Sequence, residues 1–154
     1  MGVQHLSHIG ICVSNLQRSL VFYRDGLGFR ECSKLDVSGA PVDTLLQLPG
    51  TQLQALYLER DGTRIELMHF SEPGHVGDGS PRAMNALGLT HLSLRVAELD
   101  ATVADLTRAG GRVLNETRIE NPEFRASAIF VSDPDGLRIE LVEQAGDPTA
   151  LPGS

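Results

Sequence analysis

The amino-acid sequence predicts an α+β fold in which two tandem βαβββ modules form one curved, eight-stranded mixed sheet around a central cavity. Two internal similarities lead to this prediction. Residues 6–30 and 89–113 share one plan: a histidine-containing strand, a polar turn, an amphipathic stretch, and then a glycine before a new strand. RDGTRIELMHF at 60–70 and PDGLRIELVEQ at 134–144 share a DG turn followed by RIEL. An internal repeat of this kind indicates the architecture before any single motif is considered.

The repeat divides the chain into four parts. We expect a first module at 1–70, a linker at 71–88, a second module at 89–144 and a C-terminal tail at 145–154. The linker is rich in Gly and Pro, which is typical of a crossover connection. The first module is longer than the second, and we expect the extra length in a loop at 36–52, where Gly and Pro mark turns around a short apolar segment.

Alternation within the strands places four polar side chains on equivalent faces. In HLSHIGICV, His8 lies opposite the isoleucines, and in THLSLRV, His91 lies opposite the leucines, as half-buried strands require. The same alternation puts Glu66 and Glu140 opposite the Ile and Leu residues of the two RIEL segments. We therefore expect these four side chains on the face of the sheet that the helices do not cover.

One helix is expected in each module, packed on the apolar face of its strands. In the first module, Ser14 or Asn15 can cap a helix that ends at Gly26. In the second module, an apolar stripe at helical spacing begins at Leu99, and the helix ends at Gly110.

The four polar residues on the uncovered face form a candidate metal site. A Glu between Ile and Leu needs a partner, because burying an unpaired charge costs several kcal/mol. Two carboxylates converging without a cation would also repel each other. Two imidazoles and two carboxylates suit one divalent ion, and Zn²⁺, Ni²⁺, Co²⁺, Fe²⁺ and Mn²⁺ all remain candidates. The sequence therefore predicts metal ligands at His8, Glu66, His91 and Glu140.

The other histidines and both cysteines are not assigned to this site. His5 and His69 have the wrong strand alternation and His75 falls in the linker, so we expect all three at the surface. Cys12 and Cys32 have no CxxC spacing, and we expect them to be reduced thiols.

Composition and charge exclude several classes of partner. The formal charge of −7 and the absence of a Lys/Arg cluster argue against nucleic-acid binding. No apolar run approaches the roughly 20 residues that span a bilayer. The N-terminus has no basic region followed by an apolar stretch, so we expect no secretory signal and a cytoplasmic protein.

Two segments resemble a known superfamily. LSHIGICVSNLQRSLVFYRDGLGF at 6–29 is similar to the first strand and helix of the vicinal oxygen chelate superfamily, and DPDGLRIELVE at 133–143 is similar to its closing hairpin. That superfamily includes glyoxalase I, methylmalonyl-CoA epimerase, extradiol dioxygenases, fosfomycin-modifying transferases and bleomycin-resistance proteins. The resemblance covers nearly the whole chain.

Carried over to this sequence, the resemblance implies one divalent metal held by His8, Glu66, His91 and Glu140. This set is similar to that of bacterial glyoxalase I, whereas related epimerases often have Gln at the position of Glu66. The implied function is that of a metal-dependent lyase or isomerase of the glyoxalase I-like type. Such an enzyme binds a small oxygenated substrate through the metal and shifts a proton through an enediolate or enolate. Glu140 and Glu66 are the candidate catalytic residues.

Two alternative functions and a dimeric state also follow from the resemblance. A ring-cleaving, Fe(II)-dependent dioxygenase stays open, because related proteins exchange chemistry on one scaffold. A bleomycin-resistance-type protein that binds a small molecule is the second alternative. Four protein ligands favour the lyase or isomerase over both. Superfamily members commonly dimerise, so we expect a homodimer.

Residues that contact the substrate are less well defined by the sequence. Arg95, on the face of His91, and Arg125 are candidates for holding an anionic group, although a surface or hairpin role fits each arginine as well. Phe124, Met68 and Leu56 are candidates for an apolar pocket wall, and core packing suits them equally.

Overall fold

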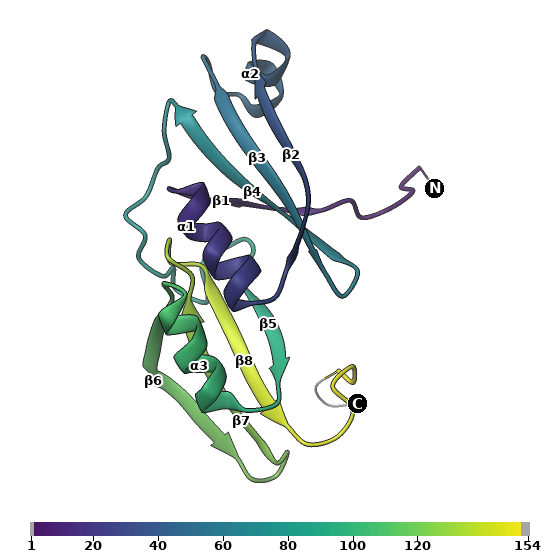
Figure 1. Ribbon diagram of the computed structural model, residues 1–154, viewed down its shortest axis with the longest axis vertical. Helices are drawn as coiled ribbons and strands as arrows, with labels where there is room; N and C mark the ends of the chain where they lie inside the picture. Colours follow the sequence, from purple (N-terminus) through teal and green to yellow (C-terminus); the bar gives the residue numbers. More distant parts are fainter. Residues whose placement is uncertain (1, 152–154) are drawn as a thin grey trace. The chain divides into compact units, whose positions relative to one another are not determined.

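A computed structural model describes residues 2–151 and divides the chain into two compact units, Met1–Gly77 and Asp78–Ser154 (Figure 1). Each unit contains one four-stranded mixed sheet. The α+β class, the eight strands and the two βαβββ modules predicted from the repeat are confirmed. The strands are hydrogen-bonded in two four-stranded sheets, whereas one eight-stranded sheet was expected. In the described part of the chain, no helix has the length and apolar character that crossing a bilayer requires.

The first unit follows the strand order β1-β4-β3-β2. Strand β1 runs parallel to β4, and the other neighbours are antiparallel. The parallel pair requires a crossover, and the helical segment α1–η1 provides its first part (Figure 1). The elements are β1 (Ile9–Cys12), α1 (Leu16–Leu20), η1 (Val21–Gly26), β2 (Arg30–Ser38), α2 (Ala40–Leu46), β3 (Gln52–Arg60) and β4 (Thr63–Glu72).

The second unit repeats this plan with the order β5-β8-β7-β6. Strand β5 is parallel to β8, as β1 is to β4. The elements are β5 (His91–Val96), α3 (Leu99–Arg108), β6 (Arg112–Asn121), β7 (Ala126–Ser132) and β8 (Arg138–Gln144).

The helices α1 and α3 each begin at a carboxylate or amide oxygen that accepts from a backbone N–H. Of the two capping residues considered for the first helix, Asn15 is the cap, since its Oδ1 accepts from the Arg18 amide at 2.9 Å. In the second unit the acceptor comes from a strand: Glu143 Oε2 lies 2.6 Å from the Leu99 amide. This hydrogen bond ties the start of α3 to β8.

The first unit contains one helix more than the sequence predicts. Residues 36–52 were expected to form a loop, but Ala40–Leu46 forms the helix α2. The carboxylate of Asp43 accepts from the amides of Gly50 and Thr51 at 2.9 and 2.8 Å, which closes the turn after the helix. This segment has no counterpart in the second module, so the repeat gave no guidance there.

The core of each unit lies between its helix and one face of its sheet. In the first unit, Phe22 and Tyr23 of η1 and Leu58, Ile65 and Leu67 of the sheet have no exposed surface. In the second unit the fully buried side chains include Leu106, Val131, Ile139 and Leu141. The alternation predicted for the RIEL strands is confirmed, because Ile and Leu face the helix. Each RIEL glutamate is thereby placed on the opposite face.

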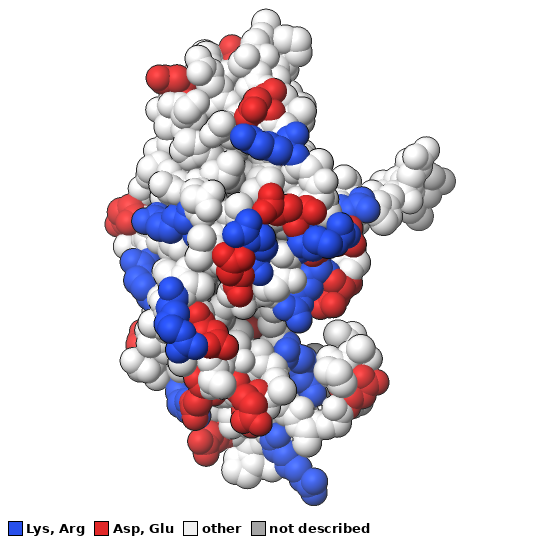
Figure 2. Space-filling view, in the orientation of Figure 1, with Lys and Arg blue, Asp and Glu red and all other residues white. Residues whose placement is uncertain are grey.

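Charged side chains of both signs are interspersed on the surface. Figure 2 shows blue and red residues interspersed in the middle and lower parts of the visible face, without a broad area of basic residues alone.

Candidate metal centre

In the first unit, one imidazole and one carboxylate meet on the uncovered face of the sheet. His8 immediately precedes β1, and its Nε2 lies 3.1 Å from Oε2 of Glu66 in β4. Gly10, the register partner of Glu66, leaves room for the side chain of Met68. A Cβ at Gly10 would lie 3.2 Å from the sulfur of Met68, and at 3.8 Å it would be in ordinary contact with Glu66 Oε2.

The carboxylate of Glu66 is buried and is held from its other side. It is 8% exposed, and its Oε1 accepts from the Tyr57 hydroxyl at 2.8 Å. Tyr57 lies opposite Glu66 in the antiparallel β3–β4 register, and its ring meets that of His8 edge to face, with centroids 5.2 Å apart. Burial, together with the hydrogen bond and the negative charge of Glu66, raises the pKa of Tyr57 above its usual value. Tyr57 therefore stays a hydroxyl donor at neutral pH and keeps Oε1 occupied.

The second unit repeats the pair with different support. His91 Nε2 lies 3.7 Å from Glu140 Oε2. Phe130 occupies the register position of Tyr57 and packs edge to face against His91, with centroids 5.5 Å apart. Phenylalanine has no hydroxyl, so Glu140 instead accepts from Ser93, whose Oγ is 2.6 Å from Oε2. Glu140 is also more exposed, with 32% of its side-chain surface accessible against 11% for Glu66.

A hydroxyl precedes each histidine and contacts its second ring nitrogen. Ser7 Oγ is 2.9 Å from Nδ1 of His8, and Thr90 Oγ1 is 2.8 Å from Nδ1 of His91. A hydroxyl oxygen can accept a hydrogen bond from Nδ1–H, and in that tautomer Nε2 keeps a lone pair for an ion. Metal-binding histidines commonly donate such a hydrogen bond from their second ring nitrogen.

The donor atoms of the first pair, but not of the second, are spaced as neighbouring ligands of one ion would be. With bonds of about 2.1 Å, adjacent ligand atoms are about 3.0 Å apart in octahedral and about 3.4 Å apart in tetrahedral geometry. The observed 3.1 Å is close to the octahedral value and 3.7 Å is somewhat wider than either. Within either unit, the described residues include no converging group of three or more His, Cys, Asp or Glu side chains. Each unit alone therefore supplies two candidate ligands.

A polar cavity of about 410 Å³ adjoins the first pair. Two arginines in its wall flank one carboxylate: Arg64 Nε is 3.1 Å and Arg30 Nη2 is 3.6 Å from oxygens of Glu59. The wall therefore carries a net positive charge that suits an anionic group on a substrate. Its lining residues are Ser7, His8, Arg30, Cys32, Ser33, Tyr57, Glu59 and Arg64.

The residues predicted to contact the substrate lie in different parts of the fold. Met68 shares the face of Glu66, whereas Leu56 lies buried on the helix-covered face as the register partner of Leu67. Arg95 donates to the backbone carbonyl of Gln144 at 3.0 Å.

Two other predicted contacts lie at the hairpin between β6 and β7. Phe124 and Arg125 are exposed there. Strand β7 begins at Ala126, four residues before Phe130, the register partner of Glu140. At about 3.3 Å per residue, this hairpin is more than 10 Å along the strand from the carboxylate.

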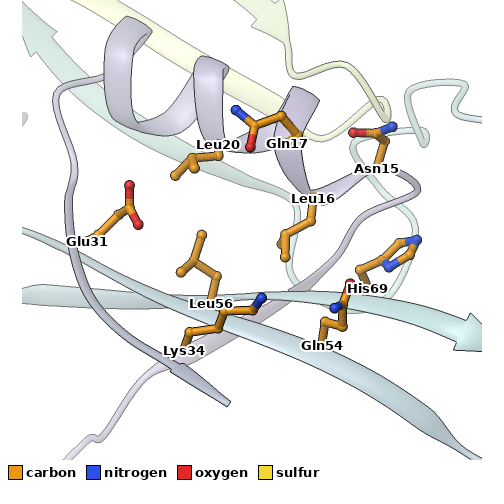
Figure 3. A pocket seen from close by; sticks show the side chains of 9 residues that line it. All are labelled: Asn15, Leu16, Gln17, Leu20, Glu31, Lys34, Gln54, Leu56 and His69. Atoms are coloured by element: carbon orange, nitrogen blue, oxygen red, sulfur yellow. The ribbon is translucent and has the colours of Figure 1, made fainter. Parts of the chain in front are cut away.

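One of the three unassigned histidines is not at the surface. His5 and His75 are exposed as predicted. His69 is partly buried, and its Nδ1 is fully buried with no hydrogen-bond partner in the described part of the chain. The alternation of β4 places His69 on the helix-covered face of the sheet, on the side of α1 (Figure 3).

The sequence did not identify the residues that support the four candidate ligands. Ser7 and Thr90 had a visible signal, because LSH and LTH both place a hydroxyl directly before the repeated histidine. Tyr57, Phe130 and Ser93 were not identified, because their relation to the glutamates depends on the register between strands rather than on alternation within one strand.

Comparison with known proteins places these features in a family. A family profile described as the glyoxalase/bleomycin resistance protein/dioxygenase superfamily matches residues 5–141. The chain is 33% identical over 147 residues to the uncharacterized protein YaeR of Escherichia coli, covering 94% of this chain and 99% of YaeR. It is 29% identical to a probable lactoylglutathione lyase of Synechocystis, covering 90% of this chain and 94% of the relative. A mouse mitochondrial methylmalonyl-CoA epimerase is 27% identical, with 91% and 72% covered.

A solved structure has the same fold. The crystal structure of a glyoxalase family protein from Bacillus cereus superposes with a TM-score of 0.80 at 22% identity, covering 95% of this chain and 97% of the other. This likeness bears on the fold alone. Because the family profile spans most of the sequence, the chain belongs to the glyoxalase/bleomycin resistance protein/dioxygenase superfamily.

Proposed function

We propose that this protein is a divalent-metal-dependent lyase or isomerase of the glyoxalase I-like type, with His8, Glu66, His91 and Glu140 as ligands of one ion. The observation that carries the proposal is the repeated pair: each unit brings one imidazole Nε2 and one carboxylate oxygen within 3.1 or 3.7 Å. Relatives named lactoylglutathione lyase and methylmalonyl-CoA epimerase support this class of activity.

The two glutamates are proposed to have unequal roles. Glu66 is buried and fixed at Oε1 by Tyr57, which leaves Oε2 beside His8 as a permanent ligand atom. Glu140 is more exposed and, among the described residues, the Ser93 hydroxyl is its only hydrogen-bond donor. A carboxylate with this freedom is the better candidate to move a proton at a substrate carbon, and Glu66 is the second candidate.

The bound ion would supply Lewis acidity, stabilising negative charge on a substrate oxygen as an enediolate or enolate develops. Within this chain, Glu140 would take the proton from the carbon beside that oxygen and return it to the neighbouring or the same carbon. Ser93 would hold the carboxylate in position between the two transfers. A positioned base of this kind contributes roughly 10²–10⁴-fold to the rate.

The proposed substrate is a small oxygenated molecule that carries an anionic group. Arg30 and Arg64, in the wall of the cavity that His8 lines, support this choice, since only one carboxylate, Glu59, offsets their two charges. We further propose a cytoplasmic homodimer, in which the two ligand pairs of one site come either from one chain or from two.

Reconstitution with single metals tests the function. The metal-free protein is loaded in turn with Ni²⁺, Co²⁺, Zn²⁺, Mn²⁺ and Fe²⁺, and bound metal, hemithioacetal isomerisation and thioester epimerisation are measured. The proposal expects one of the two activities in at least one metal form and none after chelation. Activity that appears only with Fe²⁺, O₂ and a catechol would identify a dioxygenase instead. Tight binding of an aromatic natural product in the presence of chelator, without turnover, would identify a binding protein.

A further inference from the structure

Three charged residues lie side by side across three strands of the first sheet. Arg30 of β2 is the register partner of Glu59 of β3, and Glu59 is the register partner of Arg64 of β4. Arg64 has the alternation of Glu66, so this first row lies on the uncovered face. The second sheet repeats it with a row made of Arg112, Ser132 and Arg138. The two rows differ at their centre, where the second has a serine in place of the carboxylate.

The arginines of the second row hold residues 79–82 of the linker, which we call the strap. Arg112 Nη2 donates to the carbonyl of Gly79 at 2.5 Å, and Arg138 Nε donates to the carbonyl of Arg82 at 3.0 Å. Ser132, between the two arginines, has no exposed surface, and its Oγ accepts from Arg112 Nε at 3.3 Å. Backbone carbonyls of the strap are thus the acceptors of this row.

The strap also packs closely against the turn between β7 and β8. A Cβ at Gly136 would collide with the oxygen of Gly79 and would lie 2.8 Å from its carbonyl carbon. Gly62 has the equivalent position in the first unit, two residues before RIEL, and a Cβ there would meet no described atom within 4 Å. The close approach at position 136 is therefore a feature of the second unit.

The first row is not covered in this way. Residues 2–7 precede β1 as the strap precedes β5, and all of them are exposed. Among the described residues, the only acceptor that Arg30 and Arg64 share is Glu59. The three side chains line the cavity of about 410 Å³ that also contains His8. Most of their N–H donors are therefore available to a ligand.

We propose that the strap makes the two units unequal toward the substrate, so that a carboxylate of the substrate binds to Arg30 and Arg64 and is excluded from the second row. The inference rests on the proposed function and specifies the anionic group of its substrate. Glu59 leaves the first row with one net positive charge, which one carboxylate neutralises. A phosphate dianion would instead place excess negative charge beside Glu59. Arginine suits a carboxylate because it can donate two parallel hydrogen bonds.

Arginine side-chain signals test the proposal in metal-free protein. The Nε–H groups of the four arginines are assigned in ¹H–¹⁵N spectra from single Arg→Lys variants. The wild type is titrated with propionate, with the neutral propionamide, and with sulfate as a dianion. We expect propionate to shift the first-row signals with a dissociation constant below about 100 mM, as for an exposed ion pair, and to leave the second-row signals unmoved. Propionamide should shift neither row, and sulfate should bind no more tightly than propionate.

Glu59→Gln tests the charge of the first row. The substitution keeps the size of the side chain and raises the net charge of the row to two. Propionate should then bind about threefold more tightly, and sulfate should gain more affinity than propionate does.

Gly136→Ala tests exclusion by the strap. Its Cβ should displace Gly79, after which propionate should also shift the signals of Arg112 and Arg138. Gly62→Ala is the matched control, because both glycines have a positive φ, +75° at Gly62 and +93° at Gly136, and only the second substitution meets the strap. The control should respond as the wild type does. Circular dichroism and the first-row titration report whether each variant is folded.

The titration needs no metal, so it is independent of the proposed metal centre. Failed metal reconstitution would refute the proposed function and leave the titration result as it is. The inference itself would be overturned by no first-row shift up to about 100 mM propionate, by equal shifts in both rows of the wild type, or by equal responses to propionate and propionamide. Tighter binding of sulfate than of propionate, or an unresponsive second row in folded Gly136→Ala, would also overturn it.

Discussion

Replacing Tyr57 by phenylalanine removes a single hydroxyl from the buried carboxylate of Glu66. The lost hydrogen bond spans 2.8 Å and ends on an oxygen of a residue that is only 8% exposed. Hydrogen bonds to charged groups contribute about 1.5–3 kcal/mol. Because Tyr57 is itself partly exposed, water can replace part of this interaction, and we expect a loss of about 1–2 kcal/mol. For a chain of this size that corresponds to a melting temperature lower by roughly 2–8 °C in the metal-free protein.

The same substitution should weaken metal binding by about tenfold. Residues that hydrogen-bond to metal ligands typically contribute roughly 10–100-fold to metal affinity. We expect the lower end of this range for Tyr57, because its hydroxyl is neutral. Affinity is measured by competition with a chromophoric chelator. The chain contains two tyrosines and no tryptophan, and Tyr23 is fully buried in the helical core. A tyrosine difference spectrum on metal addition would therefore report Tyr57, and it should disappear in Tyr57→Phe.

Tyr23→Phe is the matched control, because it removes a hydroxyl from the other tyrosine of the same unit. It is expected to change the melting temperature without changing metal affinity or the difference spectrum. Wild-type metal affinity in Tyr57→Phe, or equal weakening in both variants, would refute the role given to the Tyr57 hydroxyl.

The remaining predictions concern the other supports of the two pairs. Glu140→Gln should lower turnover at least about 10²-fold with the fold retained by circular dichroism, and near-normal turnover would remove Glu140 from the base role. Phe130→Tyr adds a hydroxyl at the position equivalent to Tyr57; it should lower kcat several-fold by restraining Glu140 while metal affinity is unchanged or higher, and an unchanged kcat would contradict that restraint. Ser7→Ala and Thr90→Ala should each weaken metal binding about tenfold, and chelator competition in which neither variant differs from wild type would show that the Nδ1 contacts do not support the ligands.

The repeat was sufficient to predict the two modules and the faces of the RIEL strands. Those features depend on alternation within one strand, which is visible in the sequence, and Ile65 and Ile139 are buried as that alternation requires. The helix α2 and the contact of Tyr57 with Glu66 were not predictable in the same way. The first lies in an insertion without a repeated counterpart, and the second depends on the register of two neighbouring strands.

Leu56 and His69 both lie on the helix-covered face of the first sheet. For Leu56 the sequence left a pocket wall and core packing open, and the side chain is buried on that face. His69 was expected at the surface because its alternation differs from that of Glu66. The opposite face is enclosed by α1, so the same alternation buries its Nδ1.

Counting bound metal in the wild type and in single-ligand variants tests the four-ligand centre most directly. The proposed site predicts one divalent ion per chain in the wild type by elemental analysis after dialysis. His8→Ala and His91→Ala should each reduce that number to near zero, although they change different units, because one ion needs both pairs. Full metal content in either variant, two ions per chain in the wild type, or no ion with any of the five metals would contradict a single centre built from His8, Glu66, His91 and Glu140.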